Sequence, residues 1–226
     1  MKNGCTAVIV AAGTAQRMRG IDKMMTPLSG TPLLLRTVRA LAASESITHI
    51  GIVARDDLVS LVAALCAEEP KLAFVVPGGS TRAESVLKGL ENVKTALVAI
   101  HDGARPLVTA DIIDEAITAA GESGAAAPAI PVHDTIKIAA NGFVETTPDR
   151  STLFAVQTPQ VFFTAQITQA LQAAIARGIA LTDDCSAMEA AGKPVRLTAG
   201  SEENLKITVP SDIALAEAIL KRREDR

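Results

Sequence analysis

The stretch TAVIVAAGTAQRMRGIDKMM, residues 6–25, decides the fold class. It begins with the small and β-branched run Thr6–Ala11 and passes directly into Ala12 and Gly13. An apolar run that ends in a glycine turn is typical of a buried β-strand. Cations follow the turn at Arg17, Arg19 and Lys23. The turn could therefore hold an anion against its backbone N–H groups.

The spacing in this stretch excludes two common phosphate-binding motifs. A Walker-type loop ends in Gly-Lys-Ser or Gly-Lys-Thr, and a dinucleotide fingerprint has three glycines at fixed spacing, and neither pattern is present. Arg17 and Lys23 remain as charges that could neutralise phosphoryl oxygens. Taken alone, the stretch could equally be a solvated basic loop.

The composition favours a buried parallel sheet. The 226 residues are 48% apolar but only 2% aromatic, without Trp or Tyr. The core is therefore expected to consist of Ala, Val, Ile and Leu, which fill parallel strands covered by helices. A chain of this length fits one large domain, expected to span residues 1–226.

Charge and cysteine content narrow the class of protein. The net charge is −3 and no basic block is long enough to follow a nucleic-acid backbone, so we expect no nucleic-acid partner. Cys5, Cys66 and Cys185 are odd in number and widely spaced, which favours a reducing cytoplasm over a disulfide framework. The apolar run after residues 1–4 is too short for a signal peptide or a membrane span, so a soluble protein is expected.

Strand-like and helical segments alternate along most of the chain. The strand-like segments are Thr6–Ala11, Ile47–Ala54, Leu72–Val76, Ala96–Ile100, Ala125–Val132 and Val195–Ala199. Helical apolar spacing occurs in Leu33–Ala43, Asp57–Ala67, Ala83–Leu90, Asp111–Ala120 and Ala165–Ala176. This order predicts a doubly wound sheet, in which ligands bind beyond the carboxyl ends of the strands. The loops after Val10, Val76 and Ile100 are therefore the places to look for chemistry.

One segment, residues 132–153, breaks the alternation. Two short alternating runs flank Asn141-Gly142, the pair favoured in a type I′ hairpin turn. A lone hairpin is marginal in water, so this one is expected to be an arm docked on a second copy, or else folded onto its own domain. The expected fold is a Rossmann-like, three-layer, doubly wound α/β structure with a mostly parallel sheet and a protruding β-hairpin arm.

Two further loops carry candidate site residues. In PGGSTRAESVLKGL, residues 77–90, the pair Thr81 and Glu84 is a capping box, and the paired glycines suit either a base pocket or a plain turn. In VAIHDGARP, residues 98–106, Asp102 ends a buried strand and could orient Mg²⁺ or a ribose hydroxyl, or could cap the next turn. His101 is expected to be a hydrogen-bonded structural residue.

Seven motifs in this order closely resemble the 2-C-methyl-D-erythritol 4-phosphate cytidylyltransferases, a family of the nucleotide-diphospho-sugar transferase superfamily. The resemblance runs from Thr6 to about Leu220. Its most specific parts are AAGTAQRM, GGSTRAESVLKGL, HDGARP, HDTIK, DRSTLFAVQTPQVF, LTDD and NLKIT.

The resemblance implies transfer of a cytidylyl group from CTP to a sugar-alcohol phosphate, with release of pyrophosphate and with Mg²⁺ as cofactor. It implies the catalytic residues Arg17, Lys23, Arg150 and Lys206. It places the nucleotide against Ala11, Ala12, Gly13, Gly79, Ser85 and Asp102, with Asp102 also nearest the metal. It places the acceptor against Arg105, Thr135, Arg150, Thr158, Thr182 and Lys206. The arm residues Thr135 and Arg150 would serve the neighbouring subunit of a homodimer.

The expected chemistry requires no side-chain base. A phosphate nucleophile is mostly ionised at neutral pH, so catalysis can rest on positioning and on fixed cations. The chain departs from the family in its first loop, where Ala15 replaces a usual second glycine. Asp22-Lys23-Met24 also stands where the family usually has Pro-Lys-Gln, and one residue fewer separates the arginine from the lysine. This shorter spacing alters where Lys23 is expected to reach.

Two other functions stay open at this point. A cytidylyltransferase acting on ribitol 5-phosphate would share most of these motifs. A catalytically silent nucleotide-binding protein is the alternative from a different class, suggested by the irregular segment around Lys23.

Overall fold

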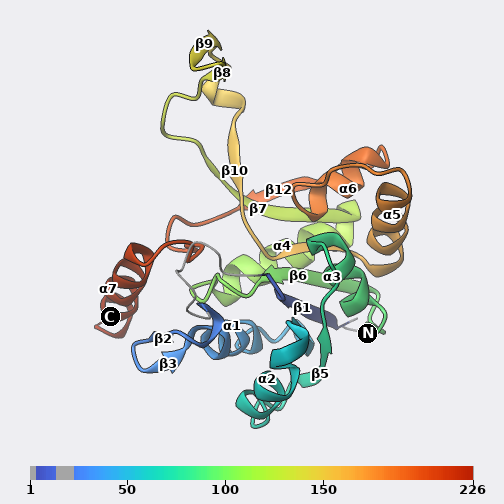
Figure 1. The fold of residues 1–226 in the computed structure, drawn as a ribbon, viewed down its shortest axis with the longest axis vertical. Coiled ribbons are helices and arrows are strands. Elements are labelled where there is room, and N and C mark those ends of the chain that lie inside the picture. Colours follow the sequence, from blue (N-terminus) through green and yellow to red (C-terminus); the bar gives the residue numbers. More distant parts are fainter. Residues whose placement is uncertain (1–3, 14–22, 226) are drawn as a thin grey trace.

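A computed structural model describes residues 4–13 and 23–225. Its centre is an eight-stranded sheet (Figure 1). The strands of this sheet are β1 (Cys5–Ala11), β4 (Ile47–Ala54), β5 (Leu72–Pro77), β6 (Leu97–Asp102), β7 (Ala125–Pro131), β10 (Phe154–Val156), β11 (Gln160–Phe163) and β12 (Arg196–Ala199). The Rossmann-like α/β fold expected from the sequence is confirmed, with β1 inside the sheet between β6 and β4.

The core of the sheet is parallel, and one strand inserts in the opposite direction. β1 pairs in parallel with β4 and β6, and β4 pairs in parallel with β5. β11 runs antiparallel between β6 and β7. Ala126 of β7 pairs with β11 on one edge and with the parallel strand β12 on the other. The carboxyl ends of β1, β5 and β6 therefore share one edge of the sheet.

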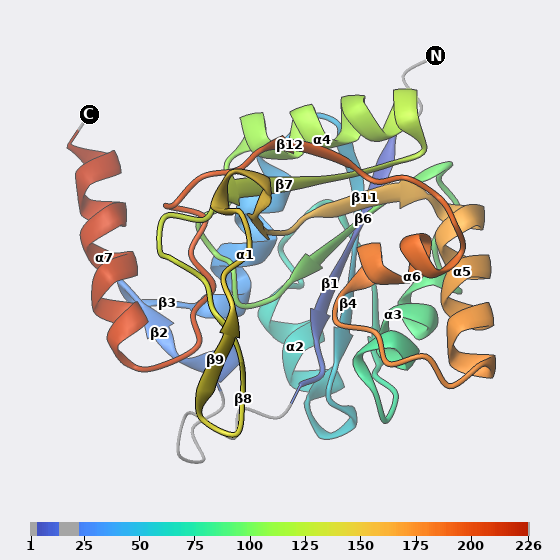
Figure 2. The ribbon, with the colours of Figure 1, turned by 90° about the horizontal axis from the view of Figure 1, so that it is seen from above.

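Helices cover both faces of the sheet (Figure 2). One face packs against α1 (Leu33–Ala42), α2 (Val59–Leu65) and α4 (Ala110–Ser123), and α7 (Ser211–Glu224) adds Ala216 and Ile219 to this core from the side of the molecule. The opposite face packs against α3 (Arg82–Leu90), α5 (Thr164–Ala176) and α6 (Asp184–Ala190). Strand β1 contributes Ile9 to the first core and Val8 to the second, because successive side chains of a strand point to opposite faces. None of the helices in the described part of the chain has the length and apolar character needed to cross a bilayer.

The arm extends away from the sheet (Figure 1). It consists of β8 (Ile138–Ala140) and β9 (Phe143–Thr146), joined by Asn141 and Gly142. Both turn residues have positive φ, 52° and 83°, as a type I′ turn requires. Every residue from 133 to 147 is exposed, so the hairpin does not fold onto its own body.

Several elements were not expected from the sequence. They are the antiparallel strands β10 and β11, the helices α6 and α7, and a small hairpin of β2 (Pro27–Leu28) and β3 (Thr31–Pro32). Short 3-10 turns occur at Lys23–Met25, Asp56–Leu58 and Arg150–Thr152. The expected strands and helices are present, with most boundaries shifted by one to three residues.

Helix α7 ties the end of the chain to the body. Glu217 accepts a hydrogen bond from the backbone N–H of Ser29, at 2.9 Å. Arg223 donates to the Leu107 carbonyl at 3.1 Å and to the carboxylate of Glu203 at 2.9 Å. The loop between β12 and α7 is thereby held against the carboxyl edge of the sheet.

Candidate active site

A cleft of about 440 Å³ lies at the carboxyl edge of the sheet. It is lined by three loops, each of which follows a parallel strand, and by Lys206 from the loop before α7. The lining residues are Val10–Gly13, Lys23, Met24, Gly79–Arg82, Ser85, Asp102–Ala104 and Lys206. The loops expected to carry chemistry, after Val10, Val76 and Ile100, are the ones that meet here.

The glycine loop after β5 is closely packed and braced by α3. A Cβ atom on Gly78 would lie 2.4 Å from the Cβ of Ala12, so only glycine lets these two loops approach. Thr81 and Glu84 form the expected capping box at the start of α3. The Ser85 hydroxyl donates to the Thr81 carbonyl at 2.9 Å and accepts from the Gly79 N–H at 3.0 Å. Ser85 therefore fixes the shape of the glycine loop as well as lining the cleft.

Asp102 is surrounded by cations. Its carboxylate lies 2.7 Å from the Lys206 ammonium, 3.6 Å from Arg82 and 3.8 Å from Arg105. Burial alone would raise the pKa of Asp102, but Lys206 and Arg82 outweigh it and hold that pKa below its ordinary value. Asp102 is therefore a fixed anion, and the cations around it leave the cleft a net positive charge.

Arg82 joins the glycine loop to helix α6. Its guanidinium donates two hydrogen bonds, 2.8 and 2.7 Å long, to the fully buried carboxylate of Asp184. Burial opposes the charge of Arg82, but Asp184 favours it and raises the pKa of Arg82 overall. Sequence reasoning missed this partnership because 102 positions separate the two residues. The signal that could have revealed α6 is Asp183 followed by Ser186, which forms a capping box in the structure.

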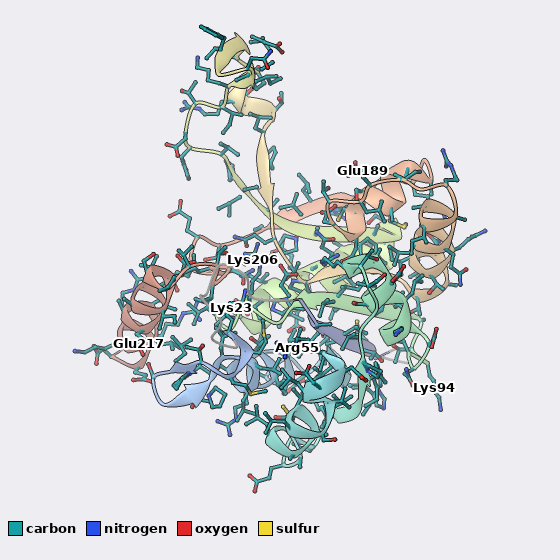
Figure 3. The ribbon with its side chains drawn as sticks, in the orientation of Figure 1. Lys23, Arg55, Lys94, Glu189, Lys206 and Glu217 are labelled. Carbon is teal, nitrogen blue, oxygen red and sulfur yellow. The ribbon has the colours of Figure 1, made fainter. Side chains whose placement is uncertain are left out.

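Lys23 points toward the same wall as Lys206. Its ammonium donates to the Ile207 carbonyl at 3.0 Å, and Lys23 also lines the cleft. Figure 3 shows Lys23 and Lys206 together below the base of the arm, whereas Lys94 and Glu217 lie at the periphery. The shortened spacing before Lys23 therefore does not keep this residue from the cleft.

Thr158 and Arg105 lie behind Asp102 and outside the cleft lining. The Thr158 hydroxyl is buried between the Asp102 N–H, at 3.1 Å, and the His101 imidazole, at 3.0 Å. Arg105 donates to the Asn204 carbonyl at 2.6 Å. His101 is fully buried and hydrogen-bonded, as expected of a structural residue.

The other expected acceptor residues are not brought to the cleft of their own subunit. Thr135 and Arg150 belong to the exposed arm, where Arg150 donates to the His133 carbonyl at 2.8 Å. Thr182 is exposed, and its N–H donates to the Ser186 hydroxyl at 3.2 Å. Arg17 lies outside the described residues.

A glycine loop, a fixed anion and converging cations at the carboxyl edge of a parallel sheet define a class: a nucleotide-binding transferase that handles phosphorylated substrates. Comparison with known proteins identifies the family within this class. The family model for 2-C-methyl-D-erythritol 4-phosphate cytidylyltransferase matches residues 5–222. The chain belongs to this family and is a cytidylyltransferase.

Relatives and solved structures agree with the family match. The chain is 44% identical over 220 residues to the 2-C-methyl-D-erythritol 4-phosphate cytidylyltransferase of Symbiobacterium thermophilum, covering 96% of this chain and 92% of the relative. It is 45% identical over 224 residues to that of Desulforamulus reducens, covering 96% of each. The crystal structure of 4-diphosphocytidyl-2C-methyl-D-erythritol synthase from Anaerococcus prevotii superposes with a TM-score of 0.87 at 27% identity, over 98% of this chain and 100% of that one.

Proposed function

We propose that this chain transfers the cytidylyl group of CTP to 2-C-methyl-D-erythritol 4-phosphate, as one catalytic domain. The products are 4-diphosphocytidyl-2-C-methyl-D-erythritol and pyrophosphate, and the reaction serves non-mevalonate isoprenoid synthesis. The observation that carries the proposal is the cleft in which Lys23, Arg82 and Lys206 converge around Asp102. The names of the relatives favour methylerythritol phosphate over ribitol phosphate as the acceptor.

The glycine loop suits cytosine. The N–H groups of residues 78–81 all donate within the protein, to the Ala54 carbonyl, the Ser85 hydroxyl and the Glu84 carboxylate. The Gly78 carbonyl accepts from Lys88 and the Thr81 carbonyl accepts from Ser85, so the loop offers a base the carbonyl oxygens of Gly79 and Ser80, which accept hydrogen bonds. Cytosine presents an amino donor at N4, whereas a base with a carbonyl at that position would place two acceptors against each other.

The cations would act on charge and position. An oxygen of the acceptor phosphate forms a bond to the α-phosphorus of CTP, and the bond from that phosphorus to the β-phosphate oxygen breaks. Pyrophosphate leaves with the electron pair. Lys23 and Lys206 would stabilise charge on the phosphoryl oxygens, and we propose the same role for Arg17. No proton has to be removed from an ionised phosphate, so the transfer step requires no side-chain base.

Magnesium fits this cleft as an ion carried chiefly by the nucleotide. Within residues 4–13 and 23–225, no three acidic, His or Cys side chains are grouped as metal ligands. Asp102 is the one carboxylate among the described residues of the cleft lining, and it could offer an oxygen to the metal. The ion would supply charge neutralisation between the phosphates.

A homodimer would complete the acceptor side. The arm exposes Ile138, Phe143 and Val144, with Phe143 78% exposed, although it belongs to a chain whose other large apolar residues are mostly buried. We propose that this surface docks on a second subunit and delivers Thr135 and Arg150 to that subunit's cleft. Thr182 would contact the acceptor from the start of α6. The three cysteines are buried and form no disulfide, which supports a cytoplasmic location.

The decisive experiment is pyrophosphate release from CTP and Mg²⁺ with a panel of acceptors. We expect 2-C-methyl-D-erythritol 4-phosphate to be turned over faster than ribitol 5-phosphate, with no release when acceptor is omitted. Faster turnover of ribitol 5-phosphate would reassign the acceptor. Binding of CTP without release for any acceptor would identify a silent nucleotide-binding protein.

A further inference from the structure

Four residues behind Asp102 form a closed ring of hydrogen bonds. His101 Nε2 bonds to the Arg105 carbonyl at 3.1 Å, and Arg105 donates to the Asn204 carbonyl at 2.6 Å. The Asn204 amide donates to the Thr158 carbonyl at 3.0 Å, and the Thr158 hydroxyl bonds to His101 Nδ1 at 3.0 Å. These residues come from the end of β6, from the segment between β10 and β11, and from the loop before α7.

The partners in this ring determine where its protons lie. A carbonyl only accepts, so Nε2 of His101 must carry the proton that reaches Arg105. The two hydrogen-bond partners of this fully buried imidazole, a carbonyl and a hydroxyl, are both uncharged, so the imidazole is neutral and Nδ1 is left as an acceptor. The Thr158 hydroxyl then donates to Nδ1, and its oxygen accepts the N–H of Asp102 at 3.1 Å.

The ring is connected to the cleft through two neighbouring residues that line it, Asp102 and Lys206. Asp102 follows His101 directly and is held through the Thr158 oxygen. Lys206 lies two residues after Asn204, and the Ile207 N–H donates to the Ala104 carbonyl at 2.8 Å. The Lys206 ammonium and the Asp102 carboxylate meet at 2.7 Å. The ring therefore joins the nucleotide side and the acceptor side of the cleft.

We propose that His101 is a positioning residue for cytidylyl transfer. By closing this ring, His101 fixes Asp102 on the nucleotide side of the cleft, and it fixes the two loops that carry Arg105 and Lys206 on the acceptor side. Thr158 is its partner and acts through Asp102. The inference rests on the proposed function. His101 itself touches no substrate, since it is fully buried and lies outside the cleft lining.

Two substitutions separate the two halves of the ring. His101→Asn keeps an acceptor near the place of Nδ1 but loses the donor to Arg105. His101→Gln keeps a donor near the place of Nε2 but loses the acceptor for Thr158. We expect each variant to lower kcat/KM about tenfold, because small displacements of positioned groups are costly. His101→Asn should mainly raise KM for the acceptor, and His101→Gln should mainly raise KM for CTP.

Matched controls distinguish a loss of positioning from a general effect of replacing a histidine. His49 is exposed on β4, so His49→Asn and His49→Gln should keep wild-type constants. Thr158→Val, which removes the hydroxyl, should behave like His101→Gln, and Thr158→Ser, which retains the hydroxyl, should lose less activity than Thr158→Val. Folded His101 variants with wild-type kcat and with both KM values unchanged would overturn the proposal.

A measurement on the wild-type chain tests the ring even if the His101 variants do not fold. In ¹⁵N-histidine NMR at pH 7.5, His101 should be neutral with its proton on Nε2. A proton on Nδ1, or a charged imidazole, would overturn the proposed ring of hydrogen bonds. Because this measurement needs no turnover, it judges the ring separately from the proposed reaction, which fails if the wild-type chain releases no pyrophosphate.

Discussion

Arg82 and Asp184 form a bidentate pair in which the carboxylate is fully buried and the guanidinium faces the cleft. The pair joins the glycine loop after β5 to the first turn of α6. Gln160 of β11 fixes the same turn, since its side-chain oxygen accepts from the N–H groups of Asp184 and Cys185 at 3.0 and 3.1 Å. Two distant segments therefore depend on one carboxylate.

Asp184→Asn should lower the free energy of unfolding by about 3 kcal/mol. It removes the buried carboxylate that holds Arg82 with two hydrogen bonds and leaves that charge with Asp102, which is 3.6 Å away. Urea denaturation measures this. The exposed pair Arg55 and Asp57 provides the control, since Asp57→Asn breaks a surface ion pair and should leave stability unchanged. Equal effects of the two substitutions would show that burial of Asp184 does not matter.

Lys206→Ala should lower kcat by at least about tenfold without unfolding the protein. Lys206 is half exposed and contacts Asp102 at the edge of the cleft, so its loss removes charge from the site and little packing. Lys94→Ala, which removes an exposed lysine far from the cleft, is the matched control (Figure 3). Steady-state kinetics with melting temperatures decide the matter, and an unchanged kcat would remove Lys206 from the catalytic set.

The proposed homodimer, in which the arm of one subunit serves the cleft of the other, predicts complementation between two impaired variants. Lys206→Ala damages the cleft and Arg150→Ala damages the arm, so a mixed dimer holds one site with neither defect. Half of the dimers are mixed after random exchange, so activity should return to roughly a quarter of the wild-type value. The two variants are mixed by co-refolding, light scattering checks that dimers form, and pyrophosphate release measures the activity. If activity stays at the level of the separate variants, then Arg150 serves its own subunit or none.

Acidification should destabilise the folded chain through His101. Its pKa is lowered from 6.5 to about 4 by burial, so between these pH values the unfolded state binds a proton that the folded state does not. Stability is therefore lost as the pH falls from 6.5 to 4, by about 3 kcal/mol. Urea denaturation with a chelator present, compared with His101→Asn, isolates the effect. Parallel stability curves for the two proteins would contradict it.

Local patterns in the sequence predict local structure well. The run Thr6–Ala11 is a strand, Thr81 and Glu84 form a capping box, and Asn141-Gly142 turns a hairpin, because each pattern fixes backbone geometry over a few residues. Position along the chain also placed Gly79 and Asp102 at the cleft, since parallel strands end at one edge.

Contacts between distant segments could not be predicted in this way. The Thr158 hydroxyl meets His101 only because β11 inserts between β6 and β7, and no local pattern encodes that insertion. Strands as short as Phe154–Val156 carry too few residues for a periodic signal. The assignments of Arg17, Thr135, Arg150 and Thr182 to the site remain predictions.

The place of β11 in the sheet has a consequence for the newly made chain. Strands β6 and β7 are complete once residue 131 has been synthesised, but the strand that separates them, Gln160–Phe163, follows only after the arm. Until then both strands expose unpaired N–H and C=O groups along an apolar edge, which is a template for pairing with other chains. Nascent or truncated chains that end within the arm should therefore aggregate or recruit chaperones, whereas the full-length chain should not.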